Sequence, residues 1–168
     1  MHAAKLTRIA VALAAAASLA ACATAPEPAP LAKKGGTWRP YQVNGVWYTP
    51  REQPKYDEVG VASWYGGHHQ GRPTANGERF DKDAVSAAHK TLPLPSIVEV
   101  INLDNGKKIR VRLNDRGPFV AGRIIDLSQE AARRLGFERA GIARVRVRYV
   151  GPGGARSAEL DMKVFIEF

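Results

Sequence analysis

The sequence of 168 residues predicts a mainly β fold, in which short strands form a small barrel with one or two short helices. Two observations predict it. Apolar and polar residues alternate along several short segments, as they do in strands with one buried face. Turn sequences rich in glycine and asparagine separate these segments, and a full set of helix-boundary signals occurs once.

The expected strands follow one another along the chain. An Asn-Gly turn predicts a hairpin over residues 41–48. Further strands are expected at residues 60–66, 97–101, 109–113, 123–127 and 144–150, with a weaker alternation at 162–168. Arginines alternate with apolar residues in two of these strands. This pattern predicts outward-facing rows formed by Arg110, Arg112, Arg144, Arg146 and Arg148.

One helix is predicted directly after Ser128, which is a suitable N-cap. Glu130 is favourable in the first turn, two arginines are favourable in the last turn, and Gly136 ends the helix. A second short helix is expected near residues 83–89.

The N-terminal residues have the features of a secretory signal. Lys5 and Arg8 precede an apolar segment at residues 9–21, which is short and rich in alanine for a membrane span. The segment ends in Leu-Ala-Ala-Cys22, which is typical of a secretory signal and resembles the lipidation site of bacterial lipoproteins. We expect a lipid anchor on Cys22; the alternative is an ordinary signal peptide with a chance cysteine. Ala23 favours the inner leaflet of the outer membrane, facing the periplasm.

These signals divide the chain into five parts. We expect a signal peptide at 1–21, a Pro/Ala-rich tether at 22–36, an extension with a hairpin at 37–58, a barrel at 59–150 and a tail or strand at 151–168. Cys22 is the single cysteine of the chain, so no internal disulfide is expected.

The formal net charge of +9 indicates acidic partners, such as anionic lipid or cell-wall polysaccharide. The secretory signal argues against nucleic acid as a partner. The composition and motifs indicate no cofactor.

Two glycine-bounded loops carry the chemistry. Residues 71–78 end in Glu78, and residues 114–119 present Asp115 beside Arg116. His89 lies between them in the sequence. A glutamate, a histidine and an aspartate on separate loops are typical of acid/base catalysis. Each also has a structural interpretation, since Asp115 could serve its turn, Glu78 could be a solvated loop residue and His89 could be a hydrogen-bonded core histidine.

Six motifs occur in an order that identifies a family. They read ASWYG at 62–66, GRPTANGE at 71–78, AAHKTLP at 87–93, NLDNG at 102–106, VRLNDRGPF at 111–119 and RIIDLS at 123–128. Together they resemble the rare lipoprotein A family of septal-ring-associated lytic transglycosylases. The resemblance covers roughly residues 59–150 and implies a six-stranded double-psi β-barrel akin to expansins.

The resemblance also implies an activity. Members cleave peptidoglycan glycan strands between N-acetylmuramic acid and N-acetylglucosamine, leave a 1,6-anhydro end and prefer strands without stem peptides. It implies cell-division proteins as partners. The alternatives are a non-catalytic, expansin-like glycan-binding lipoprotein and a structural lipoprotein that links membrane, wall and division machinery.

Site residues follow from the matching motifs. Asp115 is the leading catalytic candidate and Asp126 its alternative, with Glu78 and His89 as partners. Trp64 and Tyr65 are candidates to stack on sugars, with one of the two expected in the core. The remaining substrate-binding candidates are Thr74, Asn76 and Arg116.

The chain departs from the family pattern at two places. It reads His68-His69-Gln70 where many members have Phe-His, and neighbouring histidines without further ligands are a poor metal site, so no metal is expected. The 18 residues after Val150 are too few for a C-terminal SPOR domain, which we therefore do not expect.

Overall fold

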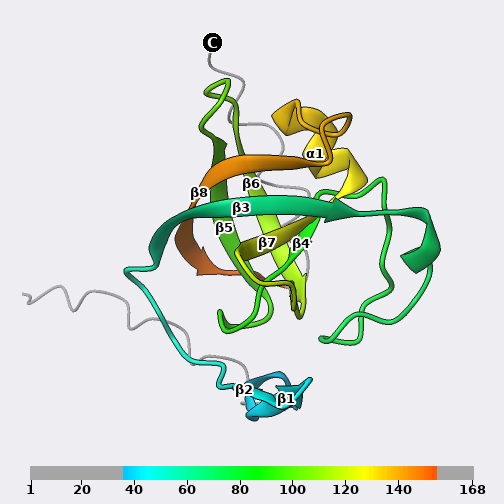
Figure 1. Cartoon of the computed structure of the whole chain (residues 1–168). Coiled ribbons are helices and arrows are strands. Elements are labelled where there is room, and N and C mark those ends of the chain that lie inside the picture. The colour runs from blue at the N-terminus through cyan, green and yellow to red at the C-terminus, as the bar shows by residue number, and fades with distance from the viewer. Residues whose placement is uncertain (1–35, 155–168) are drawn as a thin grey trace, which may run out of the picture. The chain divides into compact units, whose positions relative to one another are not determined.

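The computed structural model describes residues 36–154, in which six strands close into a barrel (Figure 1). The strands are β3 (Asp57–Tyr65), β4 (Ser86–Ala88), β5 (Ser96–Asn102), β6 (Lys108–Asp115), β7 (Arg123–Ser128) and β8 (Ile142–Pro152). Around the barrel they follow the order β3-β7-β4-β6-β5-β8, and β8 returns to β3. The expected mainly β fold is confirmed.

Parallel and antiparallel pairs both occur in this barrel. The pairs β3–β7 and β4–β6 are parallel, and the other four pairs are antiparallel. This closed, mixed, six-stranded arrangement is the double-psi β-barrel that the motifs predicted. The predictions for residues 1–35 and 155–168, which include the lipid anchor on Cys22 and the alternation at 162–168, lie outside the described residues.

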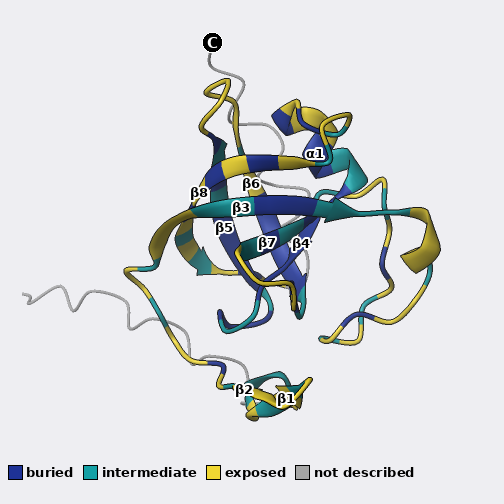
Figure 2. Cartoon of the chain, in the orientation of Figure 1, coloured by how far each residue is buried: buried dark blue, intermediate teal, exposed yellow. Residues whose placement is uncertain are grey.

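Apolar side chains from all six strands fill the barrel. Figure 2 shows the buried residues along these strands in dark blue. The strand β8 alternates between exposed and buried residues as predicted, with Val145 and Val147 fully buried and Arg144, Arg146 and Arg148 exposed. Its inward residues meet fully buried neighbours, which include Val98, Val100, Val111, Leu113, Ile125 and Leu127.

The helix α1 (Gln129–Leu135) has the predicted boundaries. The Ser128 hydroxyl accepts a hydrogen bond from the Ala131 N–H, and Gly136 ends the helix in the left-handed conformation at φ 79°. The helix buries Ala131, Ala132 and Leu135 against the barrel. No helix within residues 36–154 is long and apolar enough to cross a membrane.

A hairpin precedes the barrel, as the Asn-Gly turn predicted. It consists of β1 (Tyr41–Val43) and β2 (Val46–Tyr48) and follows a short 3₁₀ helix, η1 (Gly36–Trp38). Asn44 and Gly45 have φ values of 49° and 80°, which are the positive angles that a tight hairpin turn requires.

Two predictions were wrong. Residues 83–89 form no helix, because Ser86, Ala87 and Ala88 pair with β6 and β7 as strand β4. Arg112 does not belong to an outward-facing row, because it is 9% exposed and buried under other parts of the chain. A second helical turn occurs elsewhere, as the 3₁₀ helix η2 (Gly67–His69).

Candidate functional site

Two of the predicted carboxyl groups lie on either side of Ala88. In the strand register, Ala88 is opposite Asp115 of β6 on one side and opposite Asp126 of β7 on the other. Neighbouring strands are about 4.8 Å apart, so the two aspartate backbones are separated by roughly 10 Å. The fold therefore brings Asp115 and its predicted alternative to the same level of the barrel.

The Asp126 side chain is largely buried, with 17% of its surface exposed. Its Oδ1 accepts a short hydrogen bond from the Ser63 hydroxyl of β3, and Arg123 Nη2 lies 3.6 Å from Oδ2. Burial raises the pKa of Asp126, and the opposing effects of Ser63 and Arg123 do not cancel it. A carboxyl group with a raised pKa is suited to donate a proton at neutral pH.

Asp115 has a different environment. Its Oδ1 accepts hydrogen bonds from the main-chain N–H groups of Ala75, at 2.9 Å, and Arg116, at 2.8 Å. Main-chain donors stabilise a negatively charged carboxylate. The bond from Ala75 also fastens the loop of residues 71–78 to the end of β6.

Glu78 is clamped in that loop. Its Oε1 accepts from Arg112 Nη2 at 2.6 Å and from Asn76 Nδ2 at 3.0 Å, and its Oε2 accepts from Asn114 Nδ2 at 3.0 Å. Burial acts to raise the pKa of Glu78, but these hydrogen bonds outweigh burial and hold the pKa below its usual range. Glu78 is thus a negative charge at neutral pH, not a proton donor.

Thr74 and Asn76 complete the loop. The Thr74 hydroxyl lies 2.8 Å from Asn76 Oδ1 and 3.0 Å from the Glu78 carbonyl oxygen, and Asn76 Oδ1 accepts from the Glu78 N–H at 3.1 Å. Both side chains therefore shape the loop that presents Glu78. Their predicted contact with sugar hydroxyls stays a prediction.

His89 is buried beneath this site, and its ring forms no hydrogen bond with any of the three carboxyl groups. Its Nδ1 accepts from the N–H groups of Thr91 and Leu92, and its Nε2 lies 3.0 Å from the Tyr56 hydroxyl. Burial, together with nearby Arg116 and Lys90, lowers the pKa of His89 to about 3. The geometry is that of a neutral, hydrogen-bonded core histidine. Its link to the site is through the main chain, because the main-chain N–H of His89 donates to the Asp115 carbonyl oxygen at 3.0 Å.

Arg116 does not form an ion pair with its neighbour Asp115. Its guanidinium donates to the carbonyl oxygens of Leu92 at 2.6 Å, His89 at 3.2 Å and Thr37 at 2.6 Å. Arg116 therefore joins three segments at the rim of the site, and its positive charge remains beside Asp115.

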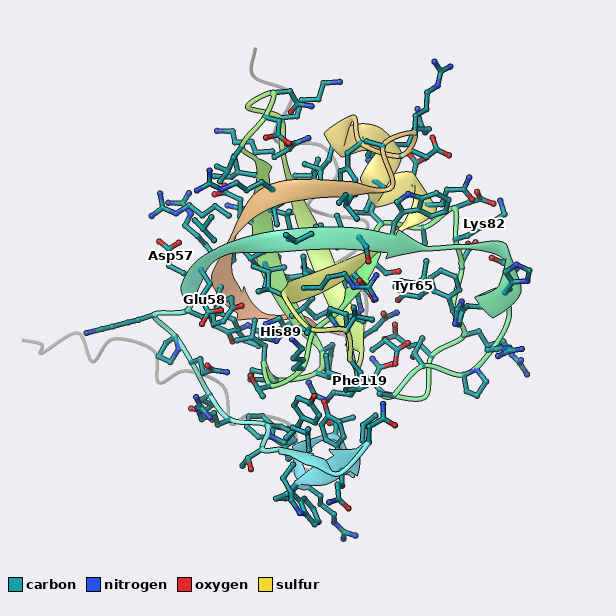
Figure 3. All side chains as sticks on the ribbon, viewed as in Figure 1. Asp57, Glu58, Tyr65, Lys82, His89 and Phe119 are labelled. Carbon is teal, nitrogen blue, oxygen red and sulfur yellow. The ribbon has the colours of Figure 1, made fainter. Side chains whose placement is uncertain are left out.

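The two aromatic residues at the end of β3 are both partly buried and have different contacts. Trp64 packs against the hydrophobic core, and its Nε1 donates to the Glu138 carbonyl oxygen at 3.0 Å. Tyr65 instead points toward the site, where it stacks on Phe80 at 4.4 Å and meets the edge of His69 at 5.5 Å (Figure 3). Burial raises the pKa of Tyr65, and so do the charges of Asp115 and Asp126. Its buried hydroxyl has no hydrogen-bond partner within the described part of the chain.

Several residues of this site were not predicted from the sequence. Arg112 and Asn114 hold Glu78, and Ser63 binds Asp126. Arg112 and Asn114 lie within the motif that carries Asp115, and Ser63 lies within the motif at 62–66, so their motifs were a usable signal. Tyr56, the partner of His89, lies outside every motif. Within residues 36–154, no group of three or more His, Cys, Asp or Glu side chains is placed to hold a metal ion.

The fold and the site define a double-psi β-barrel protein with an acidic site at one level of the barrel. The family model described as "Lytic transglycolase" matches residues 57–147, from the start of β3 into β8. The chain belongs to this family.

Two relatives are similar over most of this chain. The endolytic peptidoglycan transglycosylase RlpA of Neisseria meningitidis serogroup B is 48% identical over 130 residues, which are 77% of this chain and 54% of the relative. That of Pseudomonas aeruginosa strain PAO1 is 50% identical over 129 residues, which are 76% of this chain and 38% of the relative. The chain thus spans about half or less of the length of these relatives.

A solved structure shares the fold. The Streptomyces papain inhibitor is 24% identical, with a TM-score of 0.50 over 60% of this chain and 99% of that chain.

Proposed function

We propose that this protein is an endolytic peptidoglycan lytic transglycosylase. It cleaves the bond between N-acetylmuramic acid and N-acetylglucosamine within glycan strands, preferentially those without stem peptides, and leaves 1,6-anhydro-muramic ends. Family membership supports this activity, as do relatives near 50% identity that carry the name of this activity.

The observation that carries the proposal is the pair of carboxyl groups flanking Ala88 in unlike surroundings. The reaction needs a proton for the glycosidic oxygen that leaves, and it needs negative charge near the cationic sugar that forms. Asp126, whose pKa burial raises, is suited to the first task. Asp115 and Glu78, which accept hydrogen bonds from N–H donors, are suited to the second.

The steps balance without water or a cofactor. Asp126 gives its proton to the glycosidic oxygen, and the bond from that oxygen to C1 of the muramic residue breaks. The C6 hydroxyl of the same muramic residue then attacks C1 and closes the 1,6-anhydro ring. The proton of that hydroxyl passes to the Asp126 carboxylate, which restores the enzyme. The attacking oxygen belongs to the substrate, so the carboxyl spacing that separates retaining from inverting hydrolases does not apply.

Product analysis tests the proposal. The purified protein is incubated with intact and amidase-stripped peptidoglycan, and the products are analysed by mass spectrometry. We expect new anhydro-muramic ends with stripped substrate, their loss in Asp126→Asn and at least a hundredfold slower release in Asp115→Asn. Asp104→Asn, an exposed aspartate in the turn between β5 and β6, is the matched control and should remain active.

Other outcomes change the assignment. Full activity of Asp126→Asn would return the role of acid to Asp115. Binding of wild-type protein to stripped glycan without new ends would contradict the enzyme and support the non-catalytic glycan-binding lipoprotein.

We further propose that a lipid on Cys22 holds the protein at the inner leaflet of the outer membrane, where it works on the wall and with cell-division proteins. The supporting observation is the sequence before Cys22. Mass spectrometry of the mature N-terminus tests it. An acylated cysteine is expected, and its absence, or membrane association that persists in Cys22→Ser, would contradict the anchor.

A further inference from the structure

The N-terminal segment of residues 36–48 packs against the rim of the site although it lies outside the residues that match the family model. The Tyr41 hydroxyl donates to the Lys90 carbonyl oxygen at 2.7 Å, and Arg116 Nη2 donates to the Thr37 carbonyl oxygen at 2.6 Å. The rings of Tyr41 and Tyr48 stack at 5.4 Å, and both contact Phe119 of the loop after Asp115 (Figure 3). The segment is therefore fixed to the loop that carries a candidate catalytic residue.

A cavity of about 290 Å³ lies between this segment and the barrel loops, lined among others by Thr37, Arg39, Tyr41, Ala75 and Arg116. One of these lining residues, Ala75, belongs to the loop of residues 71–78 that presents Glu78. The N–H of Ala75 donates to Asp115 Oδ1 at 2.9 Å, so the cavity is one residue away from Asp115. Its volume is at the lower end of the roughly 300–1,000 Å³ of small-molecule sites, which suits one sugar unit.

The cavity has the chemistry of an anionic sugar site. Two guanidinium groups line it, and Arg116 lies 5.9 Å from the centre of the Tyr41 ring. Arg116 already donates to three carbonyl oxygens and therefore contributes charge. Arg39 is exposed and is placed to reach an anion. On strand β8, by contrast, Arg146 and Arg148 are paired with Asp57 and Glu99.

We propose that this cavity, the N-terminal subsite, binds one muramic acid unit of the glycan strand beside the unit that is cleaved. Removal of a stem peptide exposes the lactyl carboxylate of each muramic residue, and Arg39 would recognise that carboxylate while Tyr41 offers its ring edge to the sugar. The N-terminal segment would then select peptide-stripped strands through a contact that the family barrel itself does not contain. This subsite rests on the proposed function for the identity of its ligand.

Binding measurements test the subsite without relying on turnover. The full chain is titrated with muramyl oligosaccharides without stem peptides, and with the same oligosaccharides after their lactyl carboxyls are converted to amides. We expect Arg39→Gln to raise the Kd for the carboxylate form about fivefold and to leave the Kd for the amide form within about twofold. The matched control Arg139→Gln removes the same charge from an exposed arginine between α1 and β8, and both Kd values should stay within about twofold.

The outcomes separate the subsite from the activity. Dependence on Arg39 with no anhydro ends from the wild type would support the subsite and contradict the transglycosylase. Equal losses in Arg39→Gln and Arg139→Gln, or no loss in either, would overturn the subsite while leaving the activity intact. Dependence on Arg39 in binding to phosphatidylglycerol vesicles but not to the oligosaccharides would also overturn it, in favour of a lipid surface.

Discussion

Asp115 and Asp126 are opposite neighbours of the same residue, Ala88, in a strand of three small residues. One carboxylate accepts two main-chain N–H groups, and the other is buried against a serine hydroxyl. The short strand β4 thus lies between two acids whose hydrogen-bond partners differ.

The pH dependence of catalysis should reveal the raised pKa of Asp126. If Asp126 donates the proton, kcat falls as pH rises above its raised pKa, because the carboxyl group is then ionised. It also falls at acid pH, where Glu78 becomes protonated below its lowered pKa. A pH–rate profile should therefore be bell-shaped. A profile whose alkaline limb is unchanged in an active Asp126 variant would contradict the assignment.

Removal of Arg112 should destabilise the fold. Arg112→Met removes the ion pair with Glu78 and the hydrogen bond from Arg112 to the Gly154 carbonyl oxygen. Because the Glu78 side chain is 39% exposed, water compensates in part, and we expect a loss of about 1–3 kcal/mol in the free energy of unfolding at pH 7. Urea denaturation measures it. Arg144→Met, at an exposed position of β8, should change stability by less than about 0.5 kcal/mol.

The same pair predicts a pH dependence of stability. The folded-state pKa of Glu78 is lowered, so its contribution is present above the unfolded-state pKa and is lost as pH falls through the folded-state value. The difference between wild type and Arg112→Met should hence shrink below about pH 4. An unchanged difference at pH 3 would show that the lost stability has another origin.

His89 should make the protein sensitive to mild acid. Its folded-state pKa of about 3 lies far below the usual value for histidine, so the unfolded chain takes up a proton that the folded protein excludes. Stability is complete above about pH 6.5 and declines as pH falls toward 3. His89→Asn keeps an acceptor near the N–H groups of Thr91 and Leu92 but does not titrate. Denaturation at about pH 7, about pH 5.5 and about pH 4.5 should show a smaller decline in stability in this variant. An equal decline would contradict the role of His89.

The variant Tyr65→Phe tests whether the Tyr65 hydroxyl forms a hydrogen bond with the substrate. Since this buried hydroxyl has no hydrogen-bond partner among residues 36–154, Tyr65→Phe should be at least as stable as the wild type. If the hydroxyl donates to the bound sugar, kcat/KM should fall about tenfold in this variant. Tyr149→Phe on β8 is the control for loss of a tyrosine hydroxyl. Unchanged kcat/KM in Tyr65→Phe would restrict Tyr65 to stacking.

Local patterns predicted most of the fold. The helix after Ser128, the Asn-Gly hairpin and the alternation in β8 follow from interactions between near neighbours in the chain, and all three are confirmed. Strand β4 was missed because three small residues have no readable period. Their conformation is set by pairing with β6 and β7, which are distant in sequence.

Sequence reasoning named the acids of the candidate site but not the residues that hold Glu78 and Asp126 in place. The alternation on β6 placed Arg110 and Arg112 on one outer face, but the loop of Glu78 covers that face at Arg112 and buries it. Conversely, His89 was a catalytic candidate because histidine is a common acid/base residue. In the structure its ring contacts the Tyr56 hydroxyl, which is the geometry of a structural histidine. A contact between two segments more than 30 residues apart leaves no trace in either segment alone.

Closure of the barrel limits which parts of the protein can recognise a polymer. Each of the six strands is paired on both sides, so the barrel offers no open edge to which an extended chain could add by main-chain hydrogen bonds. A polymer must therefore be recognised by the loops and by segments laid against them. Insertions or new N-terminal segments can then alter which polymer is selected, while the six strands that keep the acids in register stay the same.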